Sequence, residues 1–244
     1  MSARFEELDF SPTAIGDIAL RRRTDPATGI DIFEVKLDDE WLMSSMFTVA
    51  EVELARIGLA RLRGFGFDVV VGGLGLGYTA VTALEDSRVR EMIVVELLEP
   101  VIGWHERGLV PLGPALTADP RCLLQHGDFF AMAKGEGFDP EQPGRLFDAI
   151  LLDIDHSPVH VLDDGSASFY GVDGMRSLAT HLKHGGVYAM WSNDPPEPSY
   201  LEVLGQVFTD VAFQVVTFPN PLQGREATAT IYSGIRGEFS PSSG

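Results

Sequence analysis

From residue 67 onward, short apolar runs alternate with longer segments of mixed polarity. The runs are rich in valine, isoleucine and leucine, which is typical of strands buried on both faces of a sheet. Seven strands are therefore expected, at 67–71, 92–96, 121–126, 147–153, 187–191, 212–218 and 227–233.

The segments between these runs are long enough for helices that connect one strand to the next. Helices are expected at 48–63, 78–84, 99–106, 129–134, 169–184 and 200–208. Thr48 and Glu51 form a capping-box pattern at the start of the first helix, where each side chain would accept from a backbone N–H group. Residues 108–120 and 154–168 are expected to be irregular connections. The alternation predicts an α/β fold, a doubly wound and mostly parallel seven-stranded sheet with helices on both faces.

The N-terminal part has a different pattern. Residues 17–45 alternate between apolar and polar positions, with turn-forming residues at 24–29. This predicts a small N-terminal β-hairpin region, with a third strand near 40–43, which packs on the rest of the chain because it is too short to fold unaided. The expected organisation is a β region at 1–47, a main domain at 48–238 and a disordered tail at 239–244.

Composition narrows the function classes. The chain has 244 residues, 18 Lys and Arg against 36 Asp and Glu, and a net charge of −18. Such a charge repels phosphate backbones, so nucleic acid is not an expected partner; it favours cationic ligands or serves solubility alone. The single cysteine, Cys122, suits a reducing compartment, and no apolar run is long enough to cross a membrane. A cytoplasmic location is therefore expected.

A glycine cluster directly follows the first apolar run of the main domain. Gly72, Gly73, Gly75 and Gly77 precede a helix that is expected to begin at Tyr78. Glycines allow a tight turn whose backbone N–H groups approach a ligand that side chains would exclude. The spacing differs from that of the dinucleotide fingerprint, which makes a NAD-dependent oxidoreductase the weaker alternative. The cluster predicts a nucleoside site.

Carboxylates follow the next three of these expected strands. Glu96 ends one strand, where an acid accepts from two ribose hydroxyls. Asp128 follows the next, and it would accept from an adenine amine, from helix N–H groups as an N-cap, or from both. Asp153 ends a third. Because ligands in such sheets bind outside the carboxyl ends of the strands, the three acids are expected to converge on one crevice.

Together these features resemble the spermidine synthase-like family of class I S-adenosylmethionine-dependent transferases, over about residues 30–192. The resemblance rests on short matches: the glycine turn at 72–77, Glu96, Asp119-Pro120-Arg121, Gly127-Asp128, Phe147-Asp148 with Asp153, Phe169-Tyr170, and Gly185-Gly186-Val187. It implies a Rossmann-like methyltransferase fold whose main domain binds the donor. It also implies which residues bind which part of the ligands. The glycine turn would contact the donor, Glu96 would bind the ribose and Asp128 the adenine, and Asp153 would lie beside the donor and the attacking amine.

Three positions depart from the family pattern. The family's glycine turn usually carries an aspartate that grips the donor's terminal ammonium, and its counterpart here is Gly75. The helix entry usually reads Tyr-His-Glu, whereas this chain has Glu51-Val52-Glu53, so that only Glu53 matches. The gate loop keeps a second carboxylate, Asp155, at a shifted position. These departures weigh against aminopropyl transfer and leave the adenosine contacts untouched.

The expected chemistry is attack by a neutral amine on an activated sulfonium donor. Asp153 would orient the amine and take its proton. Asp155 would hold a second ammonium group or cap its own loop. Tyr170 and Trp191 are expected near the crevice, where a ring face holds a cationic amine, although packing in the core is the commoner role for Trp191.

Three functions remain open. The favoured one is transfer of an alkyl group, preferably methyl, from S-adenosylmethionine to an amine or other small nucleophile. The alternatives are aminopropyl transfer from decarboxylated S-adenosylmethionine to putrescine or a related polyamine, and non-catalytic nucleoside binding. The expected partner is a small-molecule amine, with no membrane and no nucleic acid, and the assembly state stays open, a homodimer included. His156 and His160 are more typical of surface residues than of ligands, so no metal is expected.

Overall fold

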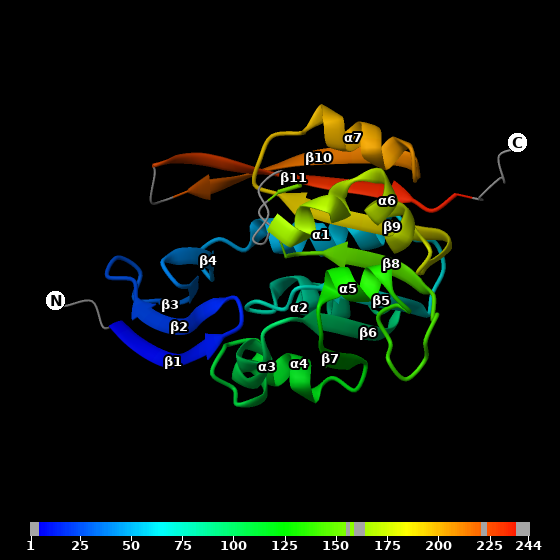
Figure 1. The fold of residues 1–244 in the computed structure, drawn as a ribbon. Helices are drawn as coiled ribbons and strands as arrows, with labels where there is room; N and C mark the ends of the chain where they lie inside the picture. The colour runs from blue at the N-terminus through cyan, green and yellow to red at the C-terminus, as the bar shows by residue number, and fades with distance from the viewer. Residues whose placement is uncertain (1–4, 155–156, 159–163, 221–223, 238–244) are drawn as a thin grey trace, which may run out of the picture.

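The computed structural model describes residues 5–154, 157–158, 164–220 and 224–237, which form two β-sheets and a set of helices (Figure 1). The smaller sheet contains β1 (Phe5–Thr13), β2 (Gly16–Thr24), β3 (Asp31–Leu37) and β4 (Glu40–Ser44). The larger contains β5 (Phe67–Gly72), β6 (Val89–Glu96), β7 (Cys122–His126), β8 (Phe147–Leu152), β9 (Leu182–Ser192), β10 (Thr209–Asn220) and β11 (Arg225–Ile235). The helices are α1 (Val49–Ala60), α2 (Tyr78–Glu85), α3 (Glu99–Glu106), α4 (Gly113–Ala118), α5 (Phe129–Lys134), the 3-10 helix η1 (Asp164–Tyr170), α6 (Val172–Ala179) and α7 (Pro198–Gly205).

The larger sheet has the strand order β10-β11-β9-β8-β5-β6-β7. Every pair from β9 to β7 is parallel, and β11 is antiparallel to both of its neighbours. This confirms the predicted seven-stranded, mostly parallel sheet. The chain runs outward from β5 through β6 to β7 and then returns to β8 on the other side of β5. The carboxyl ends of β5, β6 and β8 therefore border a switch point, where ligands bind in sheets of this kind.

Alternate residues of each parallel strand face opposite sides of the sheet. In β5, Val69 and Val71 pack into a core shared with α1 to α4, whereas Val70 packs into a second core formed with α5, α6 and α7. Because helices cover both faces, these strands are apolar at nearly every position, and the sequence pattern identifies them for that reason.

The N-terminal sheet is larger than the sequence indicates. A hairpin with a third strand is expected, but β1 adds a fourth strand by pairing with β2. Its sequence is mostly polar and exposed, so the strand forms through its partner and carries little local signal. Asp9 of β1 docks the sheet onto α3, since its carboxylate accepts from the Trp104 indole N–H at 2.6 Å and from Arg107 at 2.6 Å.

Two segments of the main domain differ from expectation. The connection at 108–120 contains the short helix α4, whose Pro114 lies in the first turn, where a proline is tolerated. In place of the helix expected at 169–184, η1 ends at Tyr170 and α6 runs from Val172 to Ala179. The helix ends before 184 because the strand that follows already begins at Leu182, paired with Phe147. The expected tail at 239–244 lies outside the described residues. Among the described residues, no helix is long and apolar enough to cross a membrane.

Candidate active site

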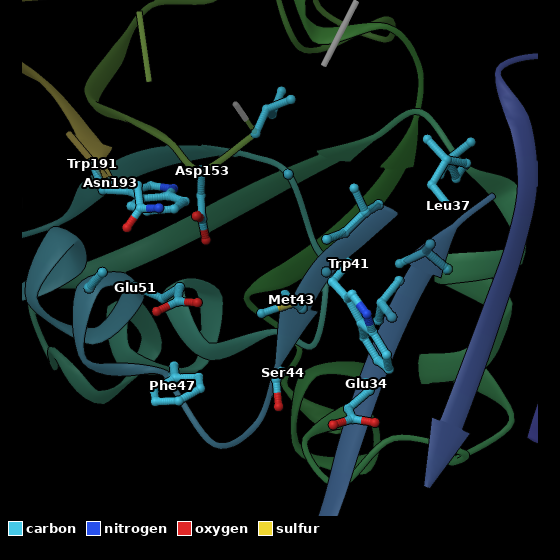
Figure 2. A pocket seen from close by; sticks show the side chains of 18 of the residues that line it. Glu34, Leu37, Trp41, Met43, Ser44, Phe47, Glu51, Asp153, Trp191 and Asn193 are labelled. Carbon is cyan, nitrogen blue, oxygen red and sulfur yellow. The ribbon is translucent and has the colours of Figure 1, made fainter. Parts of the chain in front are cut away.

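A pocket of about 930 Å³ opens at the carboxyl ends of β5, β6 and β8. Its walls come from the strand ends with α1 and the starts of α3 and α5, from the N-terminal sheet with its β4, and from the β10–β11 hairpin. Figure 2 shows β-strand residues such as Trp41 and Met43 on one side, and Glu51, Asp153 and Trp191 on the other. The predicted crevice therefore exists, and the N-terminal sheet completes it.

The glycine turn lies against this pocket through two of its members. Gly73 (φ +92°) and Gly75 (φ +48°) line the pocket, and a Cβ on Gly73 would lie 2.1 Å from the Asp153 carbonyl oxygen. Gly72 and Gly77 do not line it: a Cβ on Gly72 would strike the Phe129 ring, and Gly77 begins α2. Their expected contact with a ligand becomes a packing and turn-forming role.

The backbone N–H groups of this turn are used within the protein. Gly73 donates to Val95, Leu74 to the Glu96 carboxylate, and Gly77 to the Leu74 carbonyl. A fourth N–H group, that of Leu76, points to the Met43 sulfur at 3.0 Å. The expectation that the turn offers its N–H groups to a ligand is wrong for these four, because the fold itself satisfies them. Such a turn does not cradle a pyrophosphate, which weighs against a dinucleotide.

Glu96 lies at the end of β6 with its carboxylate fixed in place. One oxygen accepts from the Leu74 N–H at 3.0 Å and the other from the Leu98 N–H at 2.9 Å. Burial raises the pKa of this carboxyl, and the backbone N–H groups partly offset that effect. Glu96 also lines the pocket, at the place where the sequence predicts a ribose contact.

Asp128 occupies the N-cap of α5. Its carboxylate accepts from the backbone N–H groups of Phe130 at 2.8 Å and Ala131 at 3.2 Å. The residue is exposed and also lines the pocket, so the two roles that the sequence leaves open are compatible in space.

Asp153 follows β8 and faces the pocket beside Trp191 (Figure 2). Its carboxylate accepts from the Thr79 hydroxyl at 2.6 Å. Burial raises the pKa of the Asp153 carboxyl to about 6, against the lowering effect of Thr79 and of the nearby Trp191 indole. The indole N–H is buried and makes no hydrogen bond of good geometry. A carboxyl of this kind is suited to accept a proton near neutral pH.

Glu51 is a pocket residue that the sequence analysis assigned to a different task. Thr48 makes no side-chain capping bond, so the predicted capping box is wrong; the Glu51 side chain instead turns inward from α1 and is 9% exposed. Burial and the charge of Asp153 raise the pKa of the Glu51 carboxyl to about 8. Glu53, the family match, points elsewhere and pairs with Arg56 at 3.2 Å.

Known proteins provide an independent comparison. The sequence matches no protein-family model and no curated protein. The fold, however, is similar to that of spermidine synthase from Thermotoga maritima, with a TM-score of 0.69 and 16% identity over 95% of this chain and 72% of that one. The chain has the spermidine synthase fold.

Two further spermidine synthase structures are similar to this chain to about the same degree. One, in complex with the transition-state analogue AdoDATO, matches with a TM-score of 0.67 and 16% identity over 95% of this chain and 72% of that one. The other, a probable spermidine synthase from Corynebacterium glutamicum ATCC 13032, has a TM-score of 0.66 and 16% identity over 98% of this chain and 82% of that one. This confirms the resemblance at the level of the spermidine synthase fold.

Within this spermidine synthase fold, the space beside Gly75 is filled by another residue. A Cβ on Gly75 would lie 2.6 Å from the sulfur of Met43, which comes from β4 of the N-terminal sheet. The same sulfur receives the Leu76 N–H. No side chain of residue 75 is available to bind an ammonium group, and Met43 occupies the place where one would start.

Of the other residues that the sequence predicts near the site, one lies in the hydrophobic core and three lie outside the described residues. Tyr170 is 5% exposed and packs edge-on against Phe130, Phe169 and Tyr200. It lies behind the pocket wall and is not among the described residues that line the pocket, contrary to expectation. Asp155, His156 and His160 lie outside the described residues. Within the described part of the chain, no group of three or more His, Cys, Asp or Glu side chains is arranged to hold a metal ion.

One positioning residue was missed by the sequence analysis. His105 of α3 is fully buried, and its Nε2 lies 2.9 Å from the Gly75 carbonyl oxygen. Burial lowers the pKa of this imidazole, so a neutral ring with Nε2 protonated donates to the glycine turn. No local signal distinguishes it, because its role depends on α3 packing behind the turn.

Proposed function

We propose that the protein transfers an aminopropyl group from decarboxylated S-adenosylmethionine to an amine of a diamine such as putrescine. The observation that carries this proposal is the charge of the pocket. Of the described residues that line it, five are carboxylic acids, namely Glu34, Glu51, Glu96, Asp128 and Asp153. The one basic residue among them, Arg23, is already paired with Glu34 at 2.8 Å.

This charge discriminates between the two donors. S-adenosylmethionine carries a carboxylate, which would find no free cation among the described lining residues and would face Glu51 and Asp153. The decarboxylated donor carries a sulfonium and an ammonium, and both are attracted by the same carboxylates. The preference for methyl transfer that the sequence favoured has no support in the pocket or in the structural neighbours, and aminopropyl transfer is supported better.

The reaction needs little beyond orientation and removal of one proton. The amine lone pair attacks the propyl carbon bonded to sulfur; the C–N bond forms as the C–S bond breaks, and the electron pair stays on sulfur to give neutral methylthioadenosine. The attacking nitrogen loses a proton, which Asp153 accepts in its ionised form. Glu96 and Asp128 would hold the ribose and the adenine, and the apolar walls from β4 and the β10–β11 hairpin would exclude water.

The test is a product analysis with both donors. The purified protein is incubated with putrescine and either S-adenosylmethionine or its decarboxylated form, and the nucleoside product is identified by mass spectrometry. We expect methylthioadenosine from the decarboxylated donor and no adenosylhomocysteine from the other. Adenosylhomocysteine as the main product would establish methyl transfer instead. Nucleoside binding without any product, measured by calorimetry, would indicate a non-catalytic binding protein.

A further inference from the structure

Among the described residues that line the pocket, Glu51 is the one carboxylate that neither pairs with a cation nor accepts a hydrogen bond from another residue. Glu34 pairs with Arg23, while Glu96, Asp128 and Asp153 accept hydrogen bonds from backbone or hydroxyl groups of other residues. Among the described residues, the carboxylate of Glu51 accepts only from its own backbone N–H. A buried carboxylate without a partner is costly, and it is retained where a ligand completes it.

The position of Glu51 relates it to the donor's tail. Its helix α1 packs against α2, and the Thr79 hydroxyl in the first turn of α2 lies 2.6 Å from the Asp153 carboxylate and 3.2 Å from the Glu51 carbonyl oxygen. In Figure 2 the Asp153 carboxylate lies above that of Glu51 and points toward it, with Met43 beside them. This space adjoins Gly75, where residue 75 offers no side chain.

We infer that Glu51 is the counter-ion for the terminal ammonium of the donor's aminopropyl group, with Met43 closing the glycine turn beside it. The inference rests on the proposed function and adds the residue that selects the donor. The ammonium would sit beside the Glu51 carboxylate, replacing the proton that its raised pKa keeps on that group near neutral pH. Met43 would supply an apolar wall for the propyl chain. Glu51 is then a specificity residue, because a carboxylate on the donor would be repelled from the same place.

The experiment compares two nucleosides with a neutral sulfur. In S-adenosyl-3-thiopropylamine the sulfur carries an aminopropyl group that ends in the ammonium, and in methylthioadenosine it carries only a methyl group. Calorimetry gives their dissociation constants for the wild type, for Glu51→Gln, which is nearly isosteric, and for Glu53→Gln, a control on the same helix that faces away from the pocket. We expect Glu51→Gln to weaken binding of the ammonium nucleoside by about 10- to 100-fold and to change that of methylthioadenosine by less than about threefold. Glu53→Gln should change neither.

A second measurement is the number of protons released when each nucleoside binds. Titrations near pH 7 in buffers of different ionisation enthalpy should show that the ammonium nucleoside releases protons from the wild type, that methylthioadenosine releases fewer, and that Glu51→Gln removes the difference. An unchanged ratio of the two dissociation constants in Glu51→Gln would overturn the inference while leaving the proposed function intact. So would a variant that binds the ammonium nucleoside normally but has a raised KM for the diamine, since Glu51 would then serve the acceptor. If the wild type binds neither nucleoside, both proposals fail.

Discussion

The two ends of the pocket hold glutamates in opposite ways. Glu96, at the end where we propose that adenosine binds (the adenosine end), has both oxygens held by backbone N–H groups of neighbouring segments. Glu51, at the end where we propose that the amines bind (the amine end), has no such support from other described residues and faces Asp153. The first carboxylate is oriented before any ligand arrives, whereas the second is left for a cation to complete. The adenosine end therefore fixes the orientation of its carboxylate in advance, whereas the amine end offers a carboxylate that a cationic ligand would pair with.

The largest effect is expected from the amine end. Asp153→Asn removes the group that accepts the proton and keeps the side-chain shape, so turnover should fall by about 10²- to 10⁴-fold. Affinity for the nucleoside donor should stay within about tenfold. Steady-state kinetics with a parallel binding titration measure both quantities. Retained turnover would show that Asp153 is not the base, and a comparable loss of donor affinity would show that its role is binding.

At the adenosine end, Glu96→Gln tests the prearranged carboxylate. The amide nitrogen would face a backbone N–H donor, so one of the two fixing bonds is lost. We expect binding of S-adenosyl-3-thiopropylamine and of methylthioadenosine to weaken equally, by about 10- to 100-fold. Equal loss for both ligands distinguishes this end from Glu51, whose substitution should affect only the ligand with the ammonium. If Glu96→Gln weakened the binding of only one of the two nucleosides, the proposed difference between the two ends of the pocket would be wrong.

The same contrast has a consequence for stability. The Glu51 carboxyl has its pKa raised from 4.5 to about 8 in the folded chain, so the folded state binds more protons than the unfolded state between these values. Its contribution to stability is therefore greatest at low pH and is lost as the pH rises from about 4.5 through 8, the reverse of the usual acid. Glu51→Gln should stabilise the ligand-free protein at pH 8.5 by on the order of 2 kcal/mol, and by little at pH 4.5. Thermal unfolding at both pH values checks this, with Glu53→Gln as the control; a uniform or absent gain would contradict it.

The smallest effect concerns Asp128, which belongs to the adenosine end but is exposed. A serine is also a good N-cap, so Asp128→Ser should keep stability within about 0.5 kcal/mol while its shorter side chain withdraws from the adenine. We expect a three- to tenfold loss of nucleoside affinity, on the order of one ordinary hydrogen bond. Asp128→Ala, which removes the cap as well, should also lose about 1 kcal/mol of stability. Unchanged nucleoside affinity in the serine variant would show that Asp128 acts only as the N-cap of α5.

The two ends also differ in how far the sequence predicts them. Glu96, Asp128 and Asp153 follow apolar strands, and the ends of neighbouring parallel strands meet at one edge, so their convergence is predictable from local pattern and topology. The sequence around Glu51 matches the capping-box pattern of a helix N-terminus, so the sequence predicts a capping role for it. Its inward turn depends on the rotation of α1 against the sheet, which no local pattern reports.

The sequence by itself determined the strands, the α/β class and the acids at the strand ends, because burial on both faces makes each strand a continuous apolar run that is readable without knowledge of its neighbours. Only the tertiary structure decided which side chains share the pocket. Met43 comes from a separate sheet to cover Gly75, Tyr170 packs behind the wall, and the N–H groups of the glycine turn are taken by the protein itself. These outcomes depend on contacts between segments distant in the chain, whose distances are set by packing and are not encoded in any single stretch of residues.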